Sequence, residues 1–121
     1  MACILFIDDD PLTLETLKRS IEIFGHQAIL ASSGEQAQLL VAEQIPDLIL
    51  TDMNLPDVDG ISLVKQFKHD SRVSEIPIII LSASPEVDAA ELALGAGAEE
   101  FLEKPIRLDK LQSIIEHYTN G

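Results

Sequence analysis

The sequence predicts an α/β fold in which five parallel strands form one sheet with helices on both faces. The first observation is a repeated alternation along the chain, in which each short apolar run is followed by a segment of helical periodicity. The second is the length of 121 residues, which is typical of one domain. The third is a hydrophobic content of 46% with only 4% aromatic residues, so the core must be aliphatic.

A buried apolar run and a strong helix start mark the first strand and helix. Residues 3–7 are continuously apolar, which is typical of a strand buried on both faces. Asp10 and Pro11 fit the N-cap and the first position of a helix. Apolar residues then recur at helical spacing, at Leu14, Leu17, Ile21 and Phe24. Gly25 follows them and is expected to end the helix.

The second strand and helix have weaker signals. Residues 27–31 favour a short strand. Ser33 with Gln36 fits a capping box that opens a helix reaching to about Gln44. Pro46 marks the end of this helix, because proline cannot continue it.

The third unit contains the longest loop. Residues 47–51 predict a strand that ends at Asp52, and the turn-rich residues 54–60 follow it. Asp59 is the expected N-cap of a third helix, whose apolar positions are Ile61, Val64 and Phe67.

The last two units repeat the pattern. Residues 77–81 are rich in β-branched side chains and predict the fourth strand. Ser84 and Pro85 fit a cap and first position for a fourth helix that runs through Leu94. Residues 99–102 predict a short fifth strand. The last helix carries its apolar side at Leu108, Leu111, Ile114, Ile115 and Tyr118.

The charge balance excludes several partners. With 21 acidic and 8 basic residues, the formal net charge is −13, which argues against direct binding to nucleic acid or to an anionic membrane. No apolar run is long enough to cross a membrane, and the apolar start lacks the basic residues of a signal peptide. The single cysteine, Cys3, cannot form an internal disulfide, so we expect a cytoplasmic location.

Charged and polar residues follow four of the predicted strands. Asp8 and Asp9 follow the first strand, and Asp52 ends the third. Ser82 follows the fourth strand and Lys104 comes just after the fifth. In an open parallel sheet the carboxyl ends of the strands form the ligand-binding edge, so these residues should meet there. Clustered carboxylates repel one another, and a hard divalent cation such as Mg²⁺ would relieve the repulsion.

The residue types at this edge leave two chemical roles open for Asp52. Helix capping explains Asp10, but it does not explain two consecutive aspartates with a third on a neighbouring strand. Asp52 is either a metal ligand only or also a nucleophile that accepts a phosphoryl group. In the second case Ser82 would donate a hydrogen bond and Lys104 would supply a positive charge.

Four segments at the strand ends carry a family resemblance. Residues 7–11 (IDDDP), 50–60 (LTDMNLPDVDG), 80–83 (ILSA) and 97–105 (GAEEFLEKP) occur in this order. Together they resemble the receiver domain of response regulators in two-component signalling, including the chemotaxis regulators. The resemblance covers the whole chain, 1–121, as a single receiver domain. It implies the flavodoxin-like, doubly wound sheet with the strand order 2-1-3-4-5.

The resemblance also implies a phosphoacceptor and a metal site. Asp52 would take a phosphoryl group from the phosphohistidine of a histidine kinase or a histidine phosphotransfer protein. Asp9, Asp52 and the backbone carbonyl of Asn54 would bind Mg²⁺, or Mn²⁺, directly. Asp8 would hold the metal through water.

Further residues would bind the phosphoryl group and transmit the signal. Lys104 would pair with Asp52 or with the phosphoryl group, and Ser82 would move to hydrogen-bond it. The backbone N–H groups of Met53 and Ala83 would contribute. The resemblance also implies a cis peptide bond between Lys104 and Pro105.

The aromatic switch position of the family falls at Phe101, where many relatives carry tyrosine. Its movement with Ser82 would change the face made by the fourth helix, the fifth strand and the fifth helix. That face would contact a downstream protein or an output domain. Because Phe101 has no hydroxyl group, its switch would depend on burial and shape alone.

Three other functions are weighed against this reading. An aspartate-nucleophile phosphohydrolase would need a second acid two residues after Asp52, where the chain has Asn54. A flavin-binding carrier would need a phosphate-binding loop after the first strand, and the acidic residues there would repel phosphate. A receiver that binds partners without phosphorylation would not need the complete site. We therefore expect a phosphorylation switch rather than an enzyme with an external substrate.

Overall fold

The computed structural model describes residues 1–84 and 86–119 and contains one sheet of five parallel strands. The strand order β2-β1-β3-β4-β5 confirms the predicted flavodoxin-like arrangement. The strands are β1 Cys3–Ile7, β2 Gln27–Ala31, β3 Leu48–Asp52, β4 Ile78–Ser82 and β5 Glu100–Glu103. The helices are α1 Pro11–Ile23, α2 Gly34–Glu43, α3 Gly60–Lys68, α4 Val87–Ala96 and α5 Leu108–Thr119.

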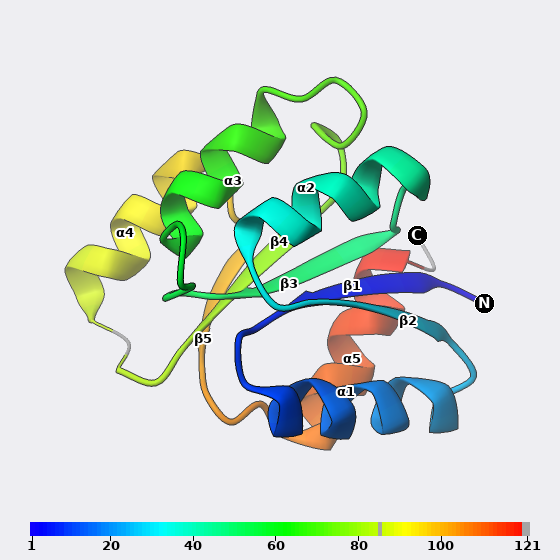
Figure 1. The fold of residues 1–121 in the computed structure, drawn as a ribbon. Coiled ribbons are helices and arrows are strands. Elements are labelled where there is room, and N and C mark those ends of the chain that lie inside the picture. Colours follow the sequence, from blue (N-terminus) through cyan, green and yellow to red (C-terminus); the bar gives the residue numbers. More distant parts are fainter. Residues whose placement is uncertain (85, 120–121) are drawn as a thin grey trace.

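Two layers of helices cover the sheet, one on each face (Figure 1). Helices α1 and α5 lie on one face, and α2, α3 and α4 lie on the other (Figure 1). Each layer closes its own core of aliphatic side chains. Leu17 and Ile114 belong to the core under α1 and α5, and Leu63 and Phe67 belong to the opposite core.

The central strands are apolar throughout because successive side chains enter opposite cores. In β4, Ile78 and Ile80 pack into the core under α2, α3 and α4, whereas Ile79 and Leu81 pack into the core under α1 and α5. All four side chains are buried. The continuous apolar runs in the sequence therefore reflect burial on both faces of the sheet.

The last three strands lie one residue further along the chain than predicted. Asp47 stays outside β3, although its N–H donates to the carbonyl of Cys3 at 2.7 Å and its carboxylate accepts the N–H of Cys3 at 2.8 Å. Pro77 stays outside β4, where it has no N–H to donate. Asp52 and Ser82 are therefore the final residues of β3 and β4.

Three predicted helix starts are confirmed. The side chains of Asp10, Ser33 and Asp59 each accept a backbone N–H from the first turn of the helix that follows. The second half of the predicted capping box differs, because the side chain of Gln36 accepts the N–H of Ser32 at 2.6 Å.

Helix α4 begins later than predicted. We expected Ser84 as the N-cap and Pro85 as the first helical residue, but the helix begins at Val87. Its N-cap, Glu86, makes no side-chain capping bond. Pro85 lies outside the described residues. The N–H of Ser84 donates to the Oγ of Ser82 at 3.2 Å, so the chain is still turning away from β4 at this point.

The close approach of α3 to the end of β3 gives a test of the fold. A Cβ at Gly60 would lie 2.8 Å from the carbonyl oxygen of Asp52. We expect Gly60→Ala to lower the free energy of unfolding by about 2 kcal/mol, because this backbone must move. In Gly95→Ala the added Cβ has nothing within 4 Å, and the helical position should gain about 0.5 kcal/mol. Urea unfolding measures both variants, and equal effects would contradict the packing described.

Candidate functional site

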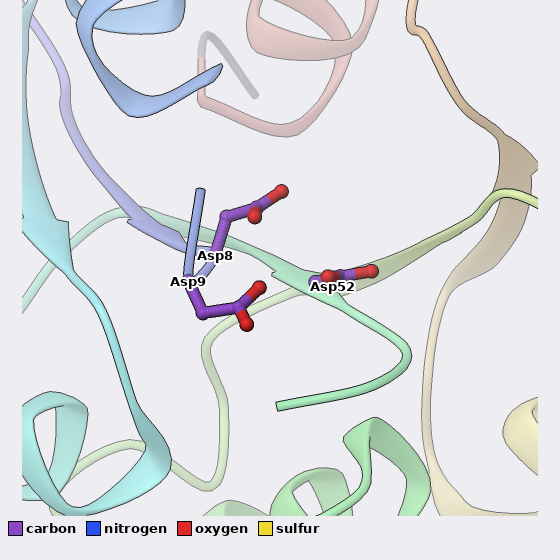
Figure 2. Close-up of side chains that lie close together, drawn as sticks. All are labelled: Asp8, Asp9 and Asp52. Atoms are coloured by element: carbon purple, nitrogen blue, oxygen red, sulfur yellow. The ribbon is translucent and has the colours of Figure 1, made fainter. Parts of the chain in front are cut away.

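Three aspartates meet where β1 and β3 end. One carboxylate oxygen from each of Asp8, Asp9 and Asp52 lies within 4.8 Å of the others. Figure 2 shows Asp8 and Asp9 leaving the end of β1, with Asp52 beside them at the end of β3. Asp8 is buried, Asp52 is half-buried and Asp9 is exposed. The structure thus brings together the three carboxylates that the sequence placed at one edge of the sheet.

Lys104 completes the charged cluster from the end of β5. Its Nζ lies 2.7 Å from Oδ2 of Asp8 and 3.5 Å from Oδ1 of Asp52. The predicted cis peptide bond between Lys104 and Pro105 is present. The sequence reading paired Lys104 with Asp52 or a phosphoryl group, whereas its shorter contact here is with Asp8.

Asp8 is also held by the backbone that follows it. Its Oδ1 accepts the N–H of Asp10 at 2.9 Å, while Oδ2 accepts the Lys104 ammonium. Both oxygens of this buried carboxylate therefore have a partner. Such satisfied groups hold a fixed orientation, so the Asp8 carboxylate keeps its position beside Asp52.

The surroundings of Asp52 disfavour its charged form. Burial raises the pKa of this carboxyl group, and the nearby negative charge of Asp8 raises it further. The Lys104 ammonium and the backbone N–H of Asn54 act in the opposite direction without cancelling the effect. For Lys104, burial lowers the pKa, but its contacts with Asp8 and Asp52 outweigh burial, so the pKa of the ammonium is raised.

This donor set fits a hard divalent cation. Oxygen ligands from carboxylates are those that Mg²⁺ prefers, and three of them approach one another closely here. Burial and the charge of Asp8 keep the pKa of Asp52 raised even with Lys104 nearby, so the cluster has less positive than negative charge around it. A cation bound between these oxygens would supply positive charge.

The other predicted site residues lie around this cluster. Ser82 is buried, and its Oγ accepts the N–H of Ser84 at 3.2 Å. The N–H of Lys104 donates to the carbonyl of Ser82 at 2.9 Å, which joins the ends of β4 and β5. Ala83 is exposed next to Ser82. Phe101 is half-buried in β5 and packs against the core under α2, α3 and α4.

The backbone at the end of β3 continues the pairing with β4. The N–H of Met53 donates to the carbonyl of Leu81 at 2.8 Å, as a continuation of the strand ladder. Its predicted contact with a phosphoryl group would require that bond to be exchanged. The N–H that acts on the Asp52 carboxylate here belongs to Asn54, a donor for which the sequence carries no signal.

Comparison with known proteins identifies the family. The family described as response regulator receiver domain matches residues 4–116. The chain belongs to this family. Response regulator MprA of Mycolicibacterium vanbaalenii is 35% identical to it over 108 residues, covering 89% of this chain and 46% of the relative. The DNA-binding dual master transcriptional regulator RpaA of Synechocystis is 32% identical, covering 92% of this chain and 46% of the relative.

Solved structures agree with the assignment. A putative response regulator of Chloroflexus aurantiacus superposes with a TM-score of 0.91 at 28% identity, covering 99% of this chain and 98% of the other. The receiver domain of the sensor histidine kinase PA1611 of Pseudomonas aeruginosa has a TM-score of 0.89 at 28% identity, with the same coverage. That second structure has a magnesium ion coordinated in its active site cleft.

These matches assign the chain to the receiver domains of two-component systems. Response regulator receiver domains are signalling switches of two-component systems, so this chain is such a switch. The receiver domain spans about half the length of the curated relatives it matches. Of the helices in its described part, none is long and apolar enough to cross a membrane.

The raised pKa of Asp52 predicts that its ionised carboxylate destabilises the folded protein. The folded state retains this proton to higher pH than the unfolded chain, so stability falls as the pH rises from the ordinary value of 3.8 through the raised pKa. We expect Asp52→Asn to raise the melting temperature at neutral pH without divalent metal, and the gain to vanish in acid. Thermal unfolding followed by circular dichroism measures both effects.

Asp70 provides the control of opposite sign. Hydrogen bonds from Arg72 lower the pKa of Asp70 to about 2. The ionised Asp70 carboxylate therefore stabilises the fold fully above pH 3.8, and this stabilisation is lost as the pH falls through the lowered pKa. Asp70→Asn should therefore lower the melting temperature at neutral pH. A fall for Asp52→Asn as well would contradict the charge balance described for the cluster.

Proposed function

We propose that this receiver domain accepts a phosphoryl group on Asp52 from the phosphohistidine of a histidine kinase or a histidine phosphotransfer protein. The position of the Asp52 carboxylate carries the proposal. It lies close to two further carboxylates and to the Lys104 ammonium, which come from other strand ends. Phosphoryl transfer needs a nucleophile placed near positive charge that neutralises the transferred oxygens. Asp52 would be the nucleophile and Lys104 would supply one positive charge, while the neighbouring carboxylates would hold the cation that supplies the rest.

The transfer itself is a displacement at phosphorus. A carboxylate oxygen of Asp52 forms the new P–O bond while the P–N bond to the donor imidazole breaks, and the imidazole leaves with the electron pair of that bond. The attack needs the ionised carboxylate. Lys104 and the N–H of Asn54 favour that form against the effect of burial.

The acidic cluster would hold the cofactor. We assign Mg²⁺, or Mn²⁺, to Asp9, Asp52 and the backbone carbonyl of Asn54, with Asp8 acting through water. The close approach of the three carboxylates supports this assignment, as does the magnesium ion in the related PA1611 receiver domain. When bound, the cation supplies positive charge against the oxygens of the transferred group.

The switch would begin at Ser82. Its hydroxyl would leave the N–H of Ser84 and donate to the phosphoryl group, with Lys104 and the N–H groups of Met53 and Ala83 as further contacts. The hydrogen bond between Lys104 and Ser82 joins β4 to β5, which supports transmission to Phe101. The new charge would favour the arrangement in which these groups are engaged and would alter the face of α4, β5 and α5.

The residue at position 54 supports a signalling role rather than an enzymatic one. The residue two positions after Asp52 is Asn54, so it cannot act as the general acid of a phosphohydrolase. We therefore propose no turnover of an external substrate. We further propose a cytoplasmic single receiver domain over 1–121. Its altered face would contact a downstream protein or output domain, and the domain itself would bind neither nucleic acid nor membrane.

Intact-mass spectrometry tests the phosphoacceptor. After incubation with a small phosphodonor and Mg²⁺, the protein should gain the mass of one phosphoryl group. Asp52→Asn and chelation of the metal should each abolish the gain, because they remove the nucleophile and the neutralising charge. Asp70→Asn should retain it. A gain that persists in Asp52→Asn would exclude the assignment.

The role of Ser82 has a separate test. Ser82→Ala should still take up the phosphoryl group, but the backbone amide shifts of α4 and β5 on phosphorylation should shrink by about half or more, because the hydroxyl that follows the charge is missing. Ser71→Ala, at an exposed turn, should leave these shifts unchanged. Full-sized shifts in Ser82→Ala, measured by two-dimensional NMR, would show that the signal takes another route.

A further inference from the structure

The loop between β3 and α3 is closed on itself at its base. The N–H of Gly60 donates to the carbonyl of Met53 at 2.6 Å, and the N–H of Leu55 donates to the carbonyl of Val58 at 3.2 Å. The loop contains Asn54, whose N–H acts on Asp52 and whose carbonyl we assign to the metal. These two backbone bonds join residues within the loop and leave its tip, around Asp57, without a contact to another helix or strand.

A second attachment holds this tip against helix α2. The Asp57 carboxylate accepts the N–H of Gly34 at 2.9 Å and the N–H of Glu35 at 2.8 Å. These two bonds join residues more than twenty positions apart in the chain. The same bonds lower the pKa of Asp57. Next to them, the side chain of Val58 lies where a Cβ on Gly34 would be, so the glycine permits the close contact.

Helix α2 already has a local cap, so the contact with Asp57 is not needed to begin the helix. The Oγ of Ser33 accepts the N–H of Gln36 at 3.1 Å, as an ordinary N-cap does. Asp57 instead accepts the two preceding N–H groups, which a local cap leaves free. Its distinct effect is to connect the loop that contains Asn54 to a helix of the α2–α3–α4 layer.

We propose that Asp57 is a positioning residue for the metal site. By tying the loop tip to the first turn of α2, it holds Asn54 in place beside Asp52 and thereby sets the affinity for Mg²⁺. The inference rests on the metal site of the proposed function. Groups that orient metal ligands without touching the metal commonly change its affinity by about tenfold or more.

The coupling must act in both directions. If the bonds from Asp57 to α2 favour metal binding, metal binding must favour those bonds to the same extent. The amide groups of Gly34 and Glu35 are not metal ligands, yet their resonances should move when Mg²⁺ binds. This response is absent if Asp57 only caps a helix.

Calorimetric titration with Mg²⁺ at about 0.15 M salt, where surface charges are largely screened, tests the proposal. Asp57→Ala should weaken Mg²⁺ binding about tenfold. Ser33→Ala removes the local cap of the same helix and should leave the affinity within about twofold, although it lowers the melting temperature. Glu35→Gln removes an exposed neighbouring charge without removing a bond of the loop, and it should also stay within about twofold.

The outcomes separate the inference from the proposed function. If the wild-type protein binds no Mg²⁺, the metal site of the proposed function is wrong. If the wild-type protein binds Mg²⁺ and Asp57→Ala binds it equally well, the positioning role is wrong. It is equally wrong if Ser33→Ala or Glu35→Gln weakens binding as much as Asp57→Ala. Mg²⁺-dependent shifts at Gly34 and Glu35 in the wild type, lost in Asp57→Ala, would support it.

Discussion

The close approach of three carboxylates at one edge of the sheet is the constraint on which the rest of this site depends. The parallel sheet brings the ends of β1 and β3 together, and with them Asp8, Asp9 and Asp52. Lys104 offsets part of this charge, mainly at Asp8, where it makes its shorter contact. Burial and the charge of Asp8 together keep the pKa of Asp52 raised, so added positive charge would stabilise the ionised cluster. The proposed metal binding and phosphoryl transfer would both use this imbalance.

The backbone around the cluster is arranged so that these groups keep their positions. Asp52 and Ser82 are the last residues of buried strands, and the N–H of Lys104 ties the end of β5 to Ser82. After β3 the chain returns to pack Gly60 against the carbonyl of Asp52, and glycine fits there because a Cβ would come within 2.8 Å of that oxygen. The site is therefore built on rigid strand ends, and its adjustable parts are short loops.

Much of the fold and the site could be predicted because their signals are local. Apolar runs bounded by turns indicated the five strands, and Asp10, Ser33 and Asp59 marked three helix starts through ordinary capping chemistry. The prediction failed for the start of α4, because Ser84 resembles a cap but its N–H instead bonds to Ser82 in the turn after β4. Residue type shows which side chains are able to cap a helix N-terminus. Whether a side chain does so depends on the conformation of the turn around it.

The sequence by itself determined the alternation of strands and helices, the acidic residues at the strand ends and the family to which they point. Each of these depends on residue type and spacing along the chain. Only the tertiary structure decided that Lys104 lies closer to Asp8 than to Asp52, and that Asp57 binds the first turn of α2. Those contacts join residues far apart in the chain, so their partners follow from strand order and loop path. No local pattern encodes them.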